Sequence, residues 1–214
     1  MNLVDPEHAY FRRAQFVLSA PAMRDLPPDD GVEIAVVGRS NVGKSTVLNA
    51  LCDQRGLART SRTPGRTQHI VVFDLAQGRR LLDLPGFGYA AVQRDLRAHW
   101  GEIVSRVLQE RRGLVGLLLL ADARLPLKQE EIRLLQWCAE VGVPVQLALN
   151  KADKLKREAA LKSFRLVQAS LASLGLAIAP MLVSATTKSG VDKLRAVLHG
   201  WFEGKKKEDP GLKT

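Results

Sequence analysis

The sequence predicts an α/β fold, a three-layer arrangement in which a doubly wound, mostly parallel sheet is flanked by helices. Apolar runs alternate with amphipathic stretches from residue 32 to residue 202, and the runs are too continuous for strands with one exposed face. A glycine-rich stretch, GRSNVGKST, follows one apolar run directly and opens a helical pattern. The strand before this stretch and the helix after it are the surroundings that a phosphate-binding loop requires.

The strands are predicted from runs rich in β-branched and aliphatic residues. In chain order they are expected at 14–20, 32–38, 69–76, 79–86, 115–123, 143–153 and 177–185. A turn at Gln77 and Gly78 separates the third run from the fourth, so those two strands are expected to form an antiparallel hairpin.

The helices are predicted from apolar residues three and four positions apart, and from KSTVLNALC at 44–52. Four further stripes are expected to face the core: Val92, Leu96, Ile103 and Val107; Leu134, Cys138 and Val141; Ala160, Phe164, Val167, Leu171 and Leu174; and Val191, Leu194 and Leu198.

The chain of 214 residues is long enough for one sizeable core. Residues 1–31 are predicted to be an N-terminal extension that adds one strand, residues 32–203 the main domain, and residues 204–214 a basic, mobile tail. A long loop rich in helix and strand breakers is expected at 54–68.

Composition narrows the class of protein. No apolar run approaches the roughly 18 residues that span a bilayer, and the N-terminus lacks the pattern of a signal peptide, so a cytoplasmic protein is expected. Cys52 and Cys138 are predicted to be reduced core thiols, and the four histidines have no metal-ligand spacing. A net charge of +10 predicts a polyanionic partner.

The stretch from Gly38 to Ser45 has the spacing of a phosphate-binding loop. Its glycines allow the backbone to curl so that N–H groups point at phosphate oxygens. Lys44 supplies positive charge to the outer phosphates, Ser45 offers a hydroxyl to Mg²⁺, and the following helix presents its positive end to the same anion. This loop alone allows either ATP or GTP.

The segment NKAD, which ends a predicted buried strand, indicates guanine. Asp153 can accept hydrogen bonds from N1–H and the 2-amino group of guanine, whereas adenine has neither donor and would leave the carboxylate unpaired. Asn150 can brace the loop and approach the base edge, and Lys151 can lay its stem across the ring. The segment VSA ends the next strand, where the N–H of Ala185 can meet the guanine O6.

The segment DLPG also follows a predicted strand. Asp83 can hold Mg²⁺ through a water molecule, and Gly86 can contact the γ-phosphate and flip when that phosphate leaves. In the long loop, Thr67 is the candidate Mg²⁺ ligand when GTP is bound, with Thr60 and Thr63 as rivals on hydroxyl chemistry alone.

These motifs, in this order, resemble the translation-factor-like GTPases. More narrowly, GRSNVGKST, LARTSRTPGRTQ, DLPGFGYA and NKADKL resemble the EngB family of bacterial GTPases, over roughly residues 14 to 202. The resemblance implies a single-domain P-loop GTPase that assists assembly of the large ribosomal subunit. It also implies a requirement for normal cell division and septation.

The resemblance further implies the residues of the site. Lys44, Thr67 and Gly86 are the expected catalytic residues, and Ser45 and Thr67 the expected Mg²⁺ ligands. His69 departs from the family, whose members carry an aliphatic residue or threonine at this position. The expected contacts to GTP or GDP are Gly38, Arg39, Ser40, Asn41, Val42, Gly43, Lys44, Ser45, Gly65, Arg66, Thr67, Gln68, His69, Asp83, Leu84, Pro85, Gly86, Asn150, Lys151, Ala152, Asp153, Val183, Ser184 and Ala185.

Two hypotheses concern the rate of hydrolysis. Phe87 stands where many such enzymes carry a water-positioning glutamine, and an apolar ring cannot orient water, so slow intrinsic hydrolysis is expected until a partner supplies the missing group. Asn41 is either a residue that shapes the loop or a ligand that holds K⁺ beside the phosphates.

The expected partner is the large ribosomal subunit or its assembly intermediates, bound through rRNA phosphates by a monomer that does not use a membrane. Arginines are expected to cluster around the two switch segments, at Arg55, Arg59, Arg62, Arg66, Arg79, Arg80, Arg94 and Arg97. One alternative is a division or signalling GTPase that acts on a protein. A metabolic nucleotide kinase is another, but it leaves NKAD unexplained.

Overall fold

The computed structural model describes residues 6–58, 69–87 and 94–204, with backbone alone at residue 6 and residues 94–100. The elements in chain order are α1 (Pro6–Phe11), β1 (Gln15–Ala20), η1 (Met23–Asp25), β2 (Val32–Gly38), α2 (Lys44–Leu51), β3 (Ile70–Ala76), β4 (Arg79–Asp83), α3 (Arg94–Glu110), β5 (Leu114–Asp122), α4 (Gln129–Glu140), β6 (Val145–Asn150), η2 (Ala152–Lys154), α5 (Arg157–Ser173), β7 (Met181–Leu182) and α6 (Val191–Gly204).

One seven-stranded sheet organises the fold, in the order β1-β3-β4-β2-β5-β6-β7. The strands β4, β2, β5, β6 and β7 run parallel, whereas β3 pairs antiparallel with both β1 and β4. The predicted fold class is therefore confirmed, and so is the hairpin at Gln77 and Gly78, both of which have positive φ.

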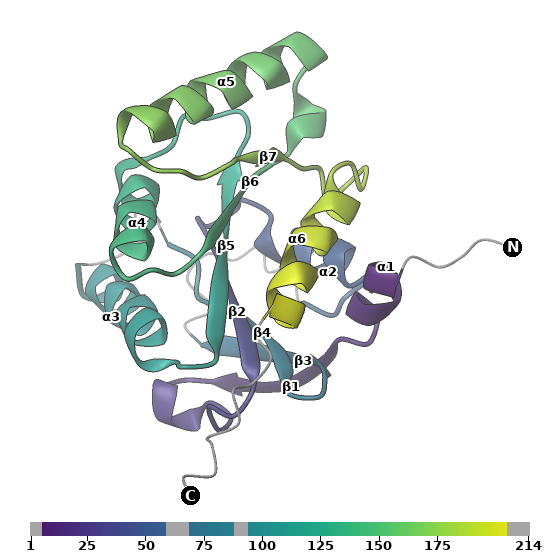
Figure 1. Ribbon diagram of the computed structural model, residues 1–214, viewed down its shortest axis with the longest axis vertical. Helices are drawn as coiled ribbons and strands as arrows, with labels where there is room; N and C mark the ends of the chain where they lie inside the picture. The colour runs from purple at the N-terminus through teal and green to yellow at the C-terminus, as the bar shows by residue number, and fades with distance from the viewer. Residues whose placement is uncertain (1–5, 59–68, 88–93, 205–214) are drawn as a thin grey trace, which may run out of the picture.

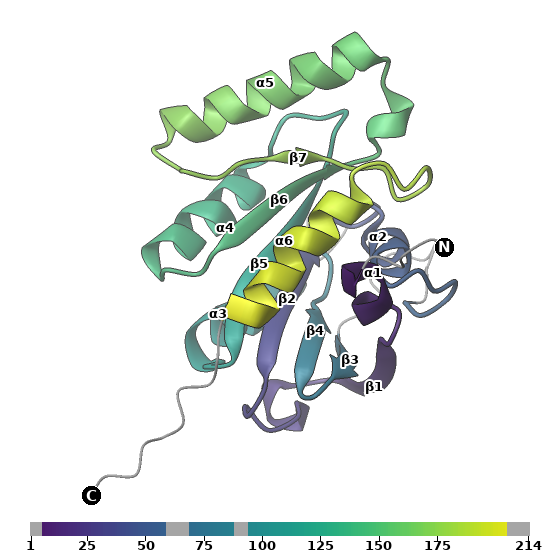
Figure 2. The same ribbon diagram turned by 45° about the vertical axis from the view of Figure 1, so that its right-hand side comes forward.

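Helices cover both faces of the sheet (Figures 1 and 2). Side chains of α3, α4 and α5 pack on one face in a cluster that includes Val104, Leu135 and Leu171. Side chains of α1, α2 and α6 pack on the other face in a cluster that includes Phe11 and Phe202. Because the central strands are buried on both faces, their runs are continuously apolar, which is the pattern that predicted them.

Several predicted bounds were wrong. The strand expected at 177–185 is only Met181–Leu182, and helix α1 was not predicted, because six residues carry too little periodicity. Val141 and Leu174 are 40% and 38% exposed, although both were assigned to core stripes. Each is the C-cap residue one position beyond the last residue of its helix, where the helical periodicity that places residues in a stripe no longer holds.

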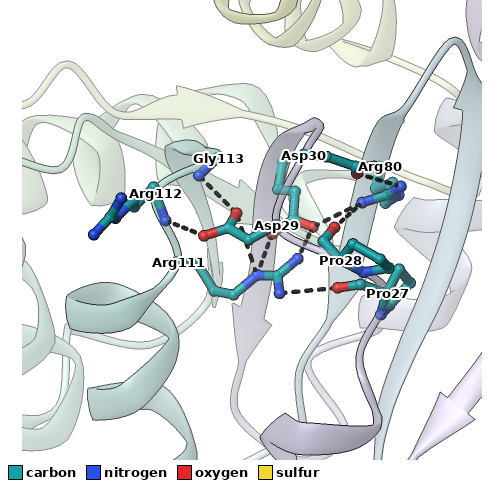
Figure 3. Close-up of polar contacts among 9 residues, drawn as sticks. Pro27, Pro28, Asp29, Asp30, Arg80, Arg111, Arg112 and Gly113 are labelled. Carbon is teal, nitrogen blue, oxygen red and sulfur yellow. Dashed lines mark hydrogen bonds and ion pairs between the residues drawn. The ribbon is translucent and has the colours of Figure 1, made fainter. Parts of the chain in front are cut away.

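An ion-pair network fastens the amino edge of the parallel strands (Figure 3). Glu33, at the start of β2, is fully buried and accepts two hydrogen bonds from the guanidinium of Arg111, one of 2.8 Å from Nε and a shorter one from Nη2. Arg111 also donates to the carbonyl of Pro27, and Asp29 accepts from the backbone N–H groups of Arg112 and Gly113. This network ties the segment before β2 to the turn between α3 and β5.

Helix α2 is capped at its C-terminus by a side chain from α6. The guanidinium of Arg195 is buried and donates to the carbonyl oxygens of Leu51 (2.7 Å) and Ala50 (2.6 Å). A cation at this end donates to carbonyl oxygens that have no partner within the helix, and it is attracted by the negative end of the helix dipole. Arg195 therefore stabilises the helix whose other end follows the glycine-rich loop.

Both cysteines are buried and free, as predicted. Burial raises the pKa of each thiol to about 12, so both stay protonated at neutral pH. Within the ranges that the structure covers, no helix combines the length and apolar character needed to cross a bilayer.

Candidate guanine-nucleotide site

The predicted motifs meet at one edge of the sheet. Strands β2, β4, β5 and β6 are parallel neighbours or near neighbours, so their carboxyl ends open at the same edge. The glycine-rich loop follows β2, the DLPG segment ends β4, and NKAD ends β6. This is the edge at which open α/β sheets bind ligands.

The glycine-rich loop has a backbone that favours glycine. Gly43 has φ +92°, and a Cβ atom there would lie 2.7 Å from Nδ2 of Asn150. Asn41 also has a positive φ of 64°. Helix α2 begins at the next residue, Lys44, and its first intrahelical bond runs from Val47 N to the carbonyl of Gly43 (2.9 Å). The loop and the first turn of α2 therefore present backbone N–H groups suited to an anion.

Lys44 and Asp83 form a shielded ion pair at this edge. Nζ of Lys44 donates to Oδ1 of Asp83, whose side chain is 7% exposed. Burial raises the pKa of Asp83, and the positive charge of Lys44 opposes that rise. The Ser45 hydroxyl lies in the first turn of α2. Hard oxygen donors of this kind suit Mg²⁺, which usually keeps waters and phosphate oxygens rather than an all-protein cage.

The DLPG segment lies against the glycine-rich loop. Leu84 N donates to Val36 O (3.0 Å), Phe87 N to Gly38 O (3.3 Å) and Ser40 N to Phe87 O (2.8 Å). A Cβ atom on Gly86 would lie 3.4 Å from Gly38 O and 3.5 Å from Ser40 N. Phe87 is only 5% exposed and packs in the cluster of α3, α4 and α5, so its ring cannot hold a water molecule at the site.

Asn150 is a buried brace between two loops. Its side-chain nitrogen donates to the carbonyl of Val42 (2.9 Å), and its side-chain oxygen accepts from Ala185 N (3.3 Å). The bracing role expected of Asn150 is thus visible in its contacts. Ala185 N was expected to meet the guanine O6, and in this structure it donates to the Asn150 side chain.

The surroundings of Asp153 favour the ionised form of its carboxyl group. Ser184 Oγ donates to Asp153 Oδ1 (2.7 Å), and Lys154 Nζ lies 3.2 Å from Oδ2. The hydrogen bond from Ser184, followed by that from Lys154, lowers the pKa of Asp153. Ala152 N donates to Val183 O (3.1 Å), which joins NKAD to the loop after β7. A fixed carboxylate here can accept two hydrogen bonds from a guanine edge.

Lys151 joins the NKAD segment to the glycine-rich loop, and neither of its two hydrogen-bond partners was predicted. Its Nζ donates to the carbonyl of Asn41 (2.6 Å) and to Oδ2 of Asp122 (3.0 Å). Asp122 is the last residue of β5, the strand beside β6. The signal in the sequence was an acidic residue at the end of a predicted buried strand, and that signal alone does not show which residue it meets.

The threonine-bearing loop expected at 54–68 lies mostly outside the described residues. Gly65, Arg66, Thr67 and Gln68 belong to that part, as do the rival threonines. His69 is described, and its Nδ1 lies 3.1 Å from Ser19 Oγ on β1.

The prediction that arginines cluster around the switch segments is wrong for Arg79 and Arg80. Arg79 and Arg80 begin β4, at the amino edge of the parallel strands, whereas Asp83 ends it. Arg79 donates to Glu203, and Arg80 to Asp30 and to the carbonyl of Pro28. These contacts hold the side chains of Arg79 and Arg80 at the amino edge of the sheet, opposite the edge where the nucleotide motifs meet. Arg55 is exposed, and of the remaining predicted arginines the structure describes no side chain.

Comparison with known proteins agrees with these motifs. Residues 33–151 match the family described as 50S ribosome-binding GTPase. A probable GTP-binding protein EngB of Aeromonas hydrophila is 45% identical over 93% of this chain and 92% of its own length. Those of Yersinia pestis and Salmonella paratyphi C are 46% and 43% identical over 90% of this chain, and the match covers 89% and 91% of their lengths.

Solved structures agree on the fold. The crystal structure of a probable GTP-binding protein EngB has a TM-score of 0.66 at 20% identity, over 81% of this chain and all of that one. Era in complex with MgGDPNP and a segment of 16S ribosomal RNA has a TM-score of 0.62 at 23% identity, over 85% of this chain and 59% of that one.

Proposed function

This chain belongs to the EngB family of GTP-binding GTPases, and we propose that it is a switch that assists assembly of the large ribosomal subunit. Family membership gives GTP binding and GTP hydrolysis. The match of residues 33–151 to a family described as 50S ribosome-binding GTPase carries the ribosomal part of the proposal. A need for the protein in cell division and septation is proposed as the consequence of that role.

The proposed contacts with the base follow from the braced loops. Asp153 accepts from N1–H and the 2-amino group of guanine, and Lys151 covers one face of the ring with its stem. Asn150 holds the NKAD segment against the glycine-rich loop through Val42, so base and phosphate subsites keep a fixed separation. Val183, Ser184 and Ala185 close the far side of the base.

The proposed contacts with the phosphates use the other two motifs. Backbone N–H groups at the end of the glycine-rich loop and in the first turn of α2 surround the phosphates, and Lys44 exchanges Asp83 for the outer phosphate oxygens. Mg²⁺, when bound, neutralises charge that develops on those oxygens. Ser45 and Thr67 are its proposed ligands, and Asp83 would hold the ion through a water molecule.

Intrinsic hydrolysis is expected to be slow. Because Phe87 is buried and cannot orient the attacking water, turnover by the purified protein is expected to stay below about 1 s⁻¹. If Asn41 holds K⁺ beside the phosphates, the rate is higher in KCl than in NaCl at equal ionic strength. Phosphate release in the two salts measures this, and equal rates would assign Asn41 to shaping the loop alone.

The proposed partner contact is with rRNA phosphates. The net charge of +10 favours a polyanion, and aromatic residues make up only 5% of the chain, which disfavours recognition by base stacking. Backbone and shape contacts with folded RNA fit this composition better. Such binding releases counterions and therefore weakens steeply as salt rises.

Co-sedimentation with purified large ribosomal subunits tests the proposal. The full chain is compared with a non-hydrolysable GTP analogue, with GDP and without nucleotide, each at low and at moderate salt. Binding that requires the GTP form and weakens with salt is the expected result. Absence of binding in every state would leave the GTPase in place and favour a protein target in division or signalling.

A further inference from the structure

The turn after β5 is fastened beside the base-recognition segment. Asp122 and Asn150 are paired in register at the ends of β5 and β6. Ala123 N donates to Asn150 O (2.8 Å), and Ser163 Oγ of α5 donates to Ala123 O (2.6 Å). The side chain of Asp122 therefore has a defined position next to NKAD.

The carboxylate of Asp122 accepts four hydrogen bonds. Oδ1 accepts from the backbone N (3.1 Å) and Nε (2.9 Å) of Arg124, and Oδ2 from Nη2 of Arg124 (2.8 Å) and Nζ of Lys151 (3.0 Å). Burial by itself would raise the pKa of Asp122, but the bonds from Arg124 and Lys151 outweigh it and lower the pKa to about 2. The side chain is 11% exposed, so it is a shielded anion at neutral pH.

Lys151 is held at both ends. Its backbone has φ +65°, which directs the chain out of β6, and its ammonium is bonded to both Asp122 and the carbonyl of Asn41. A lysine side chain is otherwise among the most freely rotating, and fixing it costs conformational entropy. Two charge-assisted hydrogen bonds fix the stem along the line from NKAD to the glycine-rich loop.

We propose that Asp122 is a positioning residue for guanine-nucleotide binding, which holds Lys151 in the extended position that covers the base. Arg124 supports this role because it donates to both oxygens of the carboxylate and so fixes its orientation, with Oδ2 facing the ammonium of Lys151. The inference rests on the proposed function in one respect, namely that the stem of Lys151 lies against the guanine ring. The proposal gives a role to Asp122, at the end of β5, which belongs to none of the nucleotide-binding motifs.

A double-mutant cycle on the full chain tests the proposal. Asp122→Asn keeps the shape of the side chain but removes its charge, and Lys151→Met keeps an apolar stem but removes the ammonium. Titration of a fluorescent GDP analogue gives the dissociation constants. Each single variant is expected to raise the constant by about 10-fold, and the double variant by no more than Lys151→Met alone.

The matched control is Glu110→Gln, which breaks an exposed carboxylate–arginine pair on α3 and is expected to leave GDP affinity unchanged. Thermal unfolding confirms that each variant is folded at the assay temperature. If Asp122→Asn unfolds below the assay temperature, Arg124→Gln takes its place. Arg124→Gln is expected to raise the dissociation constant less than Asp122→Asn, and to have no effect in the Lys151→Met background.

Three results would overturn the proposal, and they are distinguishable. No loss of affinity in Lys151→Met would remove its premise, the contact of Lys151 with the base. With that loss present, an unchanged affinity in Asp122→Asn would show that Asp122 does not position the lysine. Additive losses in the double variant would show that Asp122 acts by a separate route. None of these results bears on ribosome binding.

Discussion

Asp153→Asn is expected to lower the affinity for GTP by at least about 100-fold and to create affinity for xanthosine triphosphate. The carboxylate accepts from Ser184 and has a lowered pKa, so it is an acceptor at neutral pH. An asparagine turns one acceptor into an N–H₂ donor, which opposes the 2-amino group of guanine. Xanthine carries a 2-oxo group at that position and accepts from the new donor. Competition of unlabelled nucleotides against a fluorescent analogue measures both changes.

The matched control for this variant is Asp74→Asn. Asp74 lies on β3 and pairs in register with Arg80, near the amino edge of the parallel strands and away from the nucleotide. The variant Asp74→Asn is expected to leave the affinities for GTP and for xanthosine triphosphate unchanged. A variant Asp153→Asn that retained the affinity of the wild-type chain for GTP would show that the base is read elsewhere.

Arg111→Met is expected to lower the free energy of unfolding by about 3–5 kcal/mol. The side chains of Glu33 and Arg111 are 0% and 8% exposed, so loss of the guanidinium leaves the Glu33 carboxylate buried without this partner and out of reach of water. Arg80, whose Nη1 lies 3.6 Å from the same carboxylate, compensates only in part. Urea denaturation of the wild-type chain and the variant measures the difference.

Arg106→Met is the matched control, because Arg106 forms an exposed pair with Glu110 on α3. Its loss is expected to cost less than about 1 kcal/mol. Equal losses in the two variants would mean that the burial of Glu33 does not carry the effect.

The sequence predicted the features that depend on short-range pattern. The continuous apolar runs located the central strands because both faces of the sheet are covered. The glycine-rich loop was predictable because its spacing requires a positive φ at Gly43 directly before the helix. Asp153 and Asn150 were predictable because guanine recognition needs those donors and acceptors at a strand end.

The features that were missed depend on contacts distant in sequence. Asp122 meets Lys151 because β5 and β6 are neighbours in the sheet, and no local pattern carries that pairing. Arg195 caps α2 from α6 for the same reason. Arg79 and Arg80 are close to the DLPG motif along the chain but lie at the other edge of the sheet, because a strand carries its two ends to opposite edges.

The central claim is that the nucleotide at this site controls binding to the large ribosomal subunit. The most direct test measures subunit affinity of the wild-type chain and of Asp153→Asn, each with non-hydrolysable analogues of GTP and of xanthosine triphosphate. We expect the GTP analogue to promote binding only of the wild-type chain, and the xanthosine analogue to promote binding only of the variant. Subunit binding that ignores which analogue occupies the site would contradict it.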